Sequence, residues 1–501
     1  VALEDHSHPA WQRLKFEELL AQQVSQMQAR AERAHLKAPV LQAHAQGLPE
    51  RLLAVLPFQL TGAQQRVCAE IAADLARPVP MHRLLQGDVG SGKTVVAALA
   101  AAVAMDAGWQ CALMAPTEIL AEQHFRKLVD WLAPLGIKVA WLTGSLKAKV
   151  KREQLAAVAS GEAQLVVGTH AVIQDQVEFA KLGLALIDEQ HRFGVAQRLQ
   201  LRSKLQSRDL EPHLLMMSAT PIPRTLAMTY LADLEVSTID ELPPGRTPIV
   251  TRVFADSRRE DVIERIRDEV AKGSQVYWVC PLIDETEDSD QAADEVAGRD
   301  SNKRPPLDLS NVTQTHQELS EALPGFGVGL LHGRLPTAEK ADVMARFSSG
   351  ELSVLVATTV IEVGVDVPNA SLMVIEHAER FGLSQLHQLR GRVGRGAVAS
   401  VCVLLYASPL SDSGKQRLKA MAETTDGFEI ARRDLEIRGP GEFMGARQSG
   451  AALLRFADLH EDEALVARAR QVAEVLLREH PQAAQRHVGR WLGHKSEYLK
   501  A

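Results

Sequence analysis

The sequence has few cysteines, few aromatic residues and no excess of positive charge. Its 501 residues include four cysteines (Cys68, Cys111, Cys280 and Cys402), which lie far apart without a C-x-x-C pair. This spacing argues against a zinc site or a disulfide framework and favours a reducing compartment. Aromatic residues make up 4% of the chain and the net charge is −7. A polyanionic partner would therefore have to be held by local basic grooves and backbone amides, with little stacking.

Long hydrophobic runs are also missing. The longest, residues 95–105, is too short to cross a bilayer, and residues 1–9 have no signal-peptide core. With 46% hydrophobic and 24% charged residues, the composition predicts a soluble, cytoplasmic protein of about three domains. The chain begins with valine instead of methionine, and we therefore expect a piece cut from a longer protein.

The clearest feature present is the stretch GDVGSGKT at residues 87–94, which matches G-x-x-x-x-G-K-[ST]. Its fixed positions are Gly87, Gly92, Lys93 and Thr94, and Gly90 and Ser91 lie between them in the loop. Glycines let backbone N–H groups surround phosphates, the lysine reaches the β/γ oxygens, and the threonine hydroxyl binds Mg²⁺. An apolar strand is expected at 81–86 and a helix at 94–107, so phosphate would lie at a helix N-terminus. The sequence predicts binding of a nucleoside triphosphate.

Two adjacent acids follow a second apolar strand. Residues 184–187 (LALI) lead into Asp188 and Glu189, and open α/β sheets place their active sites at the carboxyl ends of such strands. An Asp-Glu pair alone is more often a solvated turn. Behind an apolar strand and a phosphate loop, we predict that Asp188 holds Mg²⁺ and that Glu189 deprotonates the attacking water.

Alternating strands and helices predict an α/β protein with two parallel sheets. We expect a linker helix in 1–48 with little core of its own, an ATP-binding domain at 49–240, a second domain at 241–407 and a C-terminal segment at 408–501. Strands are expected at 111–114, 164–168, 184–187, 214–217, 275–280, 327–331, 354–357, 372–376 and 401–406. Residues 284–300 carry eight acids and one arginine, which indicates a solvated surface insertion.

Short motifs in both halves occur in an order that is similar to superfamily 2 helicases. They are FQLT at 58–61 with Gln64, then APTE at 115–118, GTH at 168–170, SATP at 218–221, residues 357–366 and QLRGRVGR at 388–395. The resemblance implies two RecA-like domains, with ATP in the cleft between them and nucleic acid across both.

Longer stretches resemble the RecG family of branched-DNA helicases. They are DEQHRFGV at 188–195, SATPIPRT at 218–225, FGLSQLHQLRGRVGR at 381–395 and GFEIARRDLEIRGPGEFMGARQSG at 427–450. The last is similar to the translocation motif shared with the transcription-repair coupling factor, whereas 2–21 and 491–501 resemble RecG specifically. The family's N-terminal wedge domain has no counterpart here, so we expect weak discrimination between forked and linear DNA.

The resemblance implies roles for individual residues at the nucleotide. Gln64 would read adenine, Phe58 would offer an aromatic face, and Arg392 and Arg395 would be arginine fingers. From the residues alone, an exposed Gln, a core Phe and a solvated arginine face are the alternatives. Gln388 is implied in catalysis, Gly364 and Asp366 in ATP binding, and His191, Ser218 and Thr220 in coupling, although Ser218 and Thr220 could equally cap a turn.

The resemblance also implies the residues that contact DNA. Thr117, Thr169, His170 and Thr358 would bind the phosphate backbone without reading sequence. In 427–450, a helix carrying Arg432, Arg433 and Arg438 would be followed by a loop with Gln448. The alternative is that this segment only packs on the second domain.

Together these features predict an ATP- and Mg²⁺-dependent double-stranded DNA translocase that remodels stalled replication forks and Holliday junctions in recombination and repair. One alternative is the motor of a transcription-repair coupling factor; only about fifty residues follow Gly450, which argues against it. Another is a nucleotide-dependent DNA-binding switch that does not move. We expect a bacterial cytoplasmic monomer with no membrane association, and the resemblance implies a single-strand-binding protein as a partner.

Overall fold

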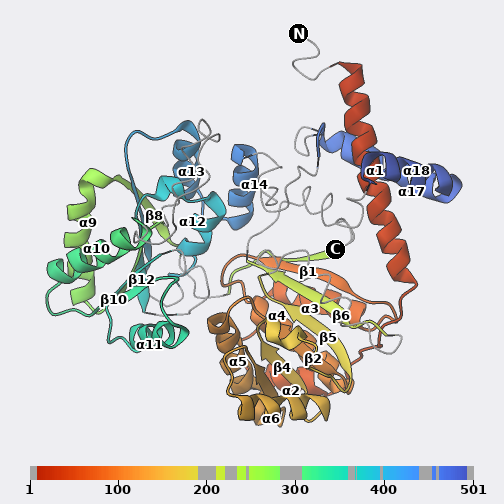
Figure 1. Cartoon of the computed structure of the whole chain (residues 1–501), viewed down its shortest axis with the longest axis horizontal. Helices are drawn as coiled ribbons and strands as arrows, with labels where there is room; N and C mark the ends of the chain where they lie inside the picture. Colours follow the sequence, from red (N-terminus) through yellow and green to blue (C-terminus); the bar gives the residue numbers. More distant parts are fainter. Residues whose placement is uncertain are drawn as a thin grey trace, which may run out of the picture. The chain divides into compact units, whose positions relative to one another are not determined.

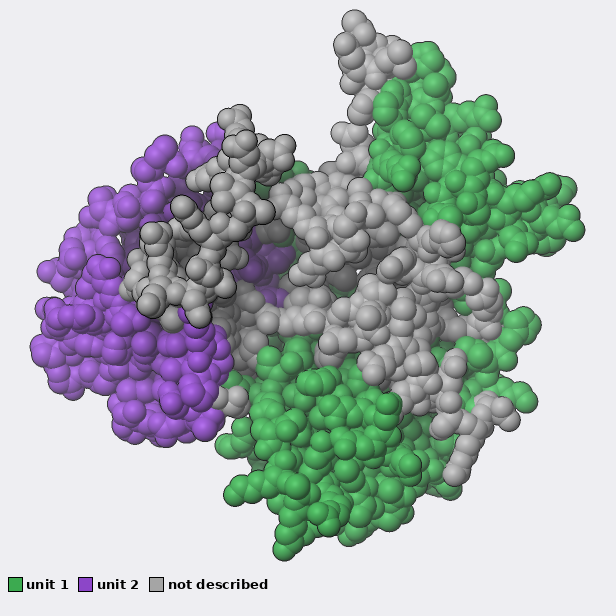
Figure 2. All heavy atoms as spheres, in the orientation of Figure 1, with its two compact units in different colours: residues 1–244, 427–501 green, residues 245–426 purple. Residues whose placement is uncertain are grey.

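The computed structural model describes residues 8–189, 210–219, 234–243, 248–281, 307–358, 367, 369–394, 399–438, 454–457 and 462–493. The chain divides into two compact units (Figure 2), residues 1–244 with 427–501 and residues 245–426. The first unit therefore joins the two ends of the chain, with the second inserted between them. The acidic stretch 284–300 lies outside the described residues.

The first unit contains a seven-stranded sheet of order β3-β4-β2-β5-β6-β1-β7 in which all pairs are parallel. Its strands are β1 (His82–Gly87), β2 (Gln110–Met114), β3 (Val139–Leu142), β4 (Leu165–Gly168), β5 (Leu182–Ile187), β6 (His213–Ser218) and β7 (Glu235–Ile239). Its helices are α2 (Leu48–Val55), α3 (Gly62–Leu75), α4 (Lys93–Asp106), α5 (Glu118–Leu132) and α6 (Ala148–Ala159). The Ala- and Val-rich α4 is buried nearly throughout, so the helix after the phosphate loop lies at the centre of the core (Figure 1).

The second unit contains a six-stranded parallel sheet of order β10-β11-β9-β12-β13-β8. Its strands are β8 (Val250–Ala255), β9 (Gln275–Val279), β10 (Val328–Leu331), β11 (Val354–Ala357), β12 (Ala370–Ile375) and β13 (Val401–Tyr406). Its helices are α9 (Arg259–Ala271), α10 (Leu307–Ala322), α11 (Thr337–Ser348), α12 (Leu383–Arg390) and α13 (Asp412–Glu423). The fold class is thus the predicted one, with two parallel-sheet domains.

A helical cluster forms from both ends of the chain. It contains α1 (Pro9–Ala34), α14 (Gly427–Arg438), α17 (Glu463–Glu479) and α18 (Pro481–Trp491), and Leu19 and Val24 of α1 are fully buried in it. Lys15 pairs with Asp462 at 3.0 Å, and the carboxylate of Glu18 accepts three hydrogen bonds from backbone N–H groups of residues 455–457. From the sequence we expect the first helix to have little core of its own, whereas it packs on α17 and α18, which are more than 400 residues away in the sequence.

Strands in the interior of each sheet lie where the sequence predicts them, but three edge strands were missed. β3 and β7 flank the first sheet and β8 flanks the second. They are only partly buried, and an edge strand needs no continuous apolar run. Residues 408–426 also group with the second unit, whereas from the sequence we expect them in the C-terminal segment at 408–501.

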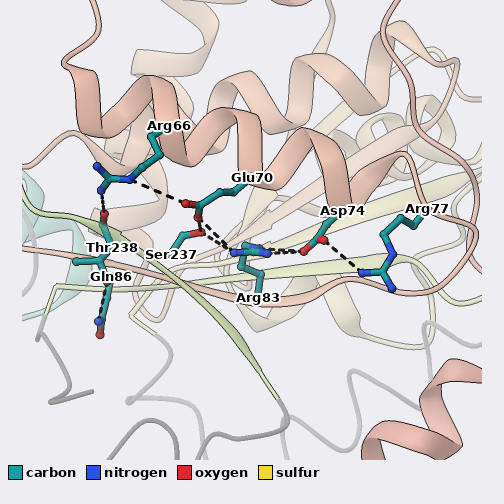
Figure 3. Close-up of polar contacts among 8 residues, drawn as sticks. All are labelled: Arg66, Glu70, Asp74, Arg77, Arg83, Gln86, Ser237 and Thr238. Carbon is teal, nitrogen blue, oxygen red and sulfur yellow. Dashed lines mark hydrogen bonds and ion pairs between the residues drawn. The ribbon is translucent and has the colours of Figure 1, made fainter. Parts of the chain in front are cut away.

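Side chains of α3 fasten the edge strand β7 to β1 (Figure 3). Arg83 of β1 is buried and donates to Asp74 at 2.7 Å and to Ser237 of β7 at 2.7 Å. One turn from the start of α3, Arg66 donates to the Thr238 carbonyl and to Asp240 at 2.9 Å. This network holds the last strand of the sheet where the chain leaves for the second unit. Within the described part of the chain, no helix is long and apolar enough to cross a membrane.

Candidate functional site

The phosphate loop connects the end of β1 to the start of α4. Gly90 and Gly92 have φ values of 77° and 89°, in the left-handed region that side chains other than glycine rarely adopt. A Cβ atom on Gly92 would lie 2.2 Å from the amide nitrogen of Gln64. The glycine at this position is therefore required both by the backbone conformation and by the close approach of α3.

The Lys93 ammonium and the Ser91 hydroxyl are placed in the loop where they could bind an anion. The ammonium of Lys93 donates to the carbonyls of Gly87 at 2.8 Å and Asp88 at 3.0 Å. The Ser91 hydroxyl is buried with no hydrogen-bond partner among the described residues. Because buried polar groups are normally paired, this hydroxyl and the N-terminus of α4 suit a phosphate group.

The two acids lie where the sequence predicts them, directly after β5. The Asp188 N–H donates to the Met114 carbonyl at the end of β2 at 2.9 Å, and the residue is buried, with 7% of its surface exposed. Glu189 has a φ of 51°. A left-handed glutamate costs of order 1 kcal/mol, and such backbone strain is concentrated at functional sites. The strained position supports the interpretation that Glu189 has a chemical task.

His124 of α5 contacts Asp188 and was not predicted. Its Nε2 atom lies 2.6 Å from Asp188 Oδ2. Burial by itself raises the pKa of Asp188, but the hydrogen bond and charge of His124 and the charge of Lys93 outweigh it and hold this pKa below its ordinary value. A carboxylate held in this way at the end of a strand suits a divalent cation. The sequence contains one indication of this contact: His124 lies on the same helical face as the apolar residues Ala121 and Leu128, where a polar side chain needs a buried partner.

Gln64 and Phe58 flank the same loop. Gln64 is 3% exposed; its amide oxygen accepts from the Thr61 N–H at 2.9 Å and its amide nitrogen donates to the Ser91 carbonyl at 2.8 Å. This side chain therefore caps α3 and braces the phosphate loop. Phe58 is 44% exposed, which leaves its ring accessible as the predicted aromatic face.

In the second unit, α12 leads into the arginine motif. Arg390 is 2% exposed and donates to the carbonyls of Met421 and Thr424, both at 2.9 Å, so it joins α12 to the end of α13. Gln388 and Arg392 are also buried. Gly364, Asp366 and Arg395 lie outside the described residues.

The predicted DNA-contacting residues lie at the carboxyl ends of strands. Thr117 precedes α5 and its hydroxyl accepts from the Leu120 N–H at 3.4 Å. Thr169 and Thr358 follow β4 and β11 and are buried, whereas His170 is exposed. Ser218 ends β6 and is buried. His191 and Thr220 are among the residues that the structure does not describe.

The predicted translocation motif begins with α14. Glu429 pairs with Arg432 at 2.7 Å and with Arg433 at 2.8 Å, and a further ion pair joins Arg432 to Glu436. The two side-chain hydrogen bonds from the arginines lower the pKa of Glu429 to about 2. Gln448 and the side chain of Arg438 lie outside the described part of the chain.

A phosphate loop and a buried Asp-Glu pair on one parallel sheet, followed by a second parallel sheet, define a P-loop nucleoside triphosphatase of the helicase class. Family models agree: residues 61–229 match the DEAD/DEAH box helicase model and 261–397 match the helicase conserved C-terminal domain. Residues 424–491 match the C-terminal part of domain 3 of the ATP-dependent DNA helicase RecG.

The chain belongs to the RecG family of ATP-dependent DNA helicases. It is 56% identical to RecG of Acidithiobacillus ferridurans over 98% of this chain and 68% of that protein. It is 54% identical to RecG of Escherichia coli K12 over 100% of this chain and 69% of that protein. A structure of RecG bound to a three-way DNA junction has a TM-score of 0.72 and 41% identity, covering 91% of this chain and 57% of that one.

Proposed function

We propose that this chain uses ATP hydrolysis to move along duplex DNA and thereby remodels branched DNA such as stalled forks and Holliday junctions. The observation that carries the proposal is the RecG-specific segment at 424–491, together with the packing of its helices α17 and α18 on α1. The motor of a transcription-repair coupling factor shares the helicase motifs and the translocation motif at 427–450, but the family model that matches the whole of 424–491 is that of RecG, which favours the RecG type.

The chemistry assigned to the first unit is phosphoryl transfer to water. Lys93 and the N-terminus of α4 bind the β- and γ-phosphates, and Glu189 orients and deprotonates the attacking water. Thr94 and Asp188 hold Mg²⁺, which, when bound, neutralises charge on the phosphate oxygens. Gln388, Arg392 and Arg395 stabilise the transition state, and Gly364 with Asp366 contributes to nucleotide binding.

The remaining predicted residues grip DNA and transmit its movement. Thr117, Thr169, His170 and Thr358 bind phosphates of the backbone, which suits small hydroxyls and backbone amides. His191, Ser218 and Thr220 couple the nucleotide site to this surface. We further propose that the protein acts as a monomer in the bacterial cytoplasm and that a single-strand-binding protein is an accessory partner.

ATP hydrolysis compared on three DNA substrates tests this function. At one fixed salt concentration, we expect forked and linear duplex DNA to stimulate hydrolysis more than single-stranded DNA does, because the motor tracks a duplex. Displacement of a triplex-forming strand from the duplex then reports movement. A nucleotide-dependent switch would bind DNA without displacing that strand, and the proposal would be wrong if duplex DNA produced neither stimulation nor displacement.

A further inference from the structure

The buried carboxylate at the nucleotide site is held by a helix that begins at the proposed DNA surface. α5 follows β2, which lies next to β5 in the sheet. His124, on this helix, is 7% exposed, and its ring nitrogen Nε2 approaches Oδ2 of Asp188 to 2.6 Å. A carboxylate that holds a divalent cation is ionised and only accepts hydrogen bonds, so in that state this contact requires the His124 tautomer with its proton on Nε2.

The carboxylate of Asp188 is fixed on both sides. Its Oδ1 atom accepts from the Glu189 N–H at 3.0 Å, and its Oδ2 atom accepts from His124. The contact with Glu189 joins two adjacent residues after β5, so it does not depend on the position of α5. The second contact joins Asp188 to α5, so a shift of α5 would act on Asp188 through His124.

α5 is a rigid connection from its first residue to His124. The Thr117 hydroxyl caps the helix, and the carboxylate of Glu118 accepts from the Ser145 hydroxyl at 2.9 Å. Ala121, His124 and Leu128 lie on its buried face. From Thr117 to His124 the helix makes about two turns, or roughly 10 Å, and packing along that stretch prevents the two ends from moving independently.

We propose that His124 is a positioning residue that holds Asp188 for a nucleotide-bound divalent cation and connects this carboxylate, through α5, to DNA bound at Thr117. The proposal rests on the proposed function, which supplies the cation at Asp188 and the DNA at Thr117. DNA that pulls on the start of α5 then changes how well Asp188 is placed, and this links DNA binding to the rate of hydrolysis.

Two substitutions at position 124 test the proposal in the full chain. In His124→Gln the amide nitrogen reaches as far as Nε2 and can still donate, whereas His124→Leu fills the space without a donor. Affinity for a fluorescent ADP analogue is measured with and without MgCl₂, and ATP hydrolysis with and without linear duplex DNA. For His124→Leu we expect about a 10–100-fold loss of the Mg²⁺-dependent gain in affinity, in the range typical of residues that support metal ligands.

The affinity measured without Mg²⁺ should stay at the parent value in both variants, because Lys93 and the phosphate loop are unchanged. Stimulation by duplex DNA should also fall in His124→Leu and be largely restored in His124→Gln. His44→Leu is the matched control, since His44 contacts Asp106 at 3.0 Å in the same unit and has no part in the site. If His124→Leu does not fold, His124→Asn replaces it, because its shorter amide cannot reach Asp188.

Three results would overturn the proposal. An unchanged Mg²⁺-dependent gain in His124→Leu would remove the positioning role, and a loss of that gain with unchanged DNA stimulation would remove the connection through α5. Equal losses in the Gln and Leu variants, accompanied by equal drops in melting temperature, would indicate packing alone. Failure of the proposed function is distinguishable, because the parent chain itself would then show no stimulation by duplex DNA.

Discussion

The two parallel sheets place a carboxylate at the same topological position and surround it differently. In the first sheet Asp188 follows β5 and its N–H donates to Met114 at the end of the neighbouring β2, at 2.9 Å. In the second sheet Glu376 follows β12 and its N–H donates to Val279 at the end of the neighbouring β9, also at 2.9 Å. The strand orders on either side of these two positions correspond.

In each sheet, a helix that begins near the carboxylate has a cationic side chain as its first residue. α4 begins at Lys93 after a glycine-rich loop, and the Lys93 ammonium rests on loop carbonyls. α9 begins at Arg259 after a short turn without glycine, residues 256–258, and Arg259 pairs directly with Glu376 at 2.6 Å and Glu318 at 3.0 Å. In the first sheet the helix-starting cation rests on loop carbonyls and the carboxylate contacts a histidine, whereas in the second sheet the helix-starting cation pairs directly with the carboxylate.

The two sheets share a fold that places a carboxylate at the carboxyl end of a strand. The loops and helices around that carboxylate determine whether it can serve a chemical function. Burial lowers the pKa of Arg259, but Glu376 and Glu318 outweigh burial and raise it above its ordinary value. Burial and the charge of Glu376 raise the pKa of the nearby Cys280 thiol well above its usual range. Arg259, Glu376 and Cys280 therefore form a structural cluster with no reactive thiolate.

The largest effect is expected at the arginines of the second unit that we propose to act in hydrolysis. Arg395→Ala should reduce ATP hydrolysis by a factor of about 10³–10⁵, the range for arginine fingers. The reason is that a guanidinium would no longer stabilise the negative charge of the transition state. Nucleotide binding should persist. Steady-state hydrolysis and equilibrium binding of a fluorescent nucleotide measure the two quantities, and turnover near the parent rate would refute the assignment.

Glu189→Gln should reduce ATP hydrolysis by a factor of about 10²–10⁴, the usual contribution of a general base. The amide cannot take the proton, but Lys93 and Asp188 remain to bind the nucleotide. Single-turnover hydrolysis separates the chemical step from product release. Glu376→Gln in the second sheet is the matched control and should leave the rate of this step unchanged, so a comparable loss there would break the contrast between the two sheets.

Arg259→Met should lower the free energy of unfolding by about 1–3 kcal/mol, because Glu376 is left partly buried without its cation. Thermal and urea denaturation measure this change, and nucleotide binding by the first unit should not respond. The double variant Arg259→Met with Glu376→Gln should lose less than the sum of the two single variants. Additive losses would mean that the two side chains do not stabilise each other.

Gln448→Ala should cut movement along duplex DNA by a factor of about 2–30, equivalent to about 0.5–2 kcal/mol of coupling, while DNA-stimulated hydrolysis stays near the parent rate. The reason is that Gln448 belongs to the predicted translocation motif at 427–450 and not to the nucleotide site. Triplex displacement and hydrolysis are measured side by side. Equal loss in both, or loss in neither, would favour the alternative that 427–450 only packs.

The smallest effect is expected at Glu429, whose pKa is lowered to about 2 by Arg432 and Arg433. A carboxylate with a lowered folded-state pKa adds stability above its unfolded-state pKa and loses it as pH falls through the folded value. We therefore expect this small contribution to disappear between about pH 4.5 and pH 2. NMR titration of the side chain checks the pKa, and an ordinary value would show that the ion pairs do not persist in solution.

The sequence by itself determined the phosphate loop, the Asp188-Glu189 pair and the interior strands, because each is encoded by neighbouring residues. A glycine-rich loop between a strand and a helix has few other uses, and a strand buried on both faces of a parallel sheet is mostly apolar. Edge strands such as β7 lack that requirement and were missed for this reason.

Only the tertiary structure decided which distant residues meet. Strand order places β2 beside β5 and so brings His124, on the helix after β2, to Asp188. In the second sheet the contact comes from α9, which follows β8, and Arg259 at its start reaches Glu376 at the end of β12. Packing of α17 and α18 on α1 likewise joins opposite ends of the chain. No local pattern encodes these contacts, because they depend on the order in which strands and helices assemble.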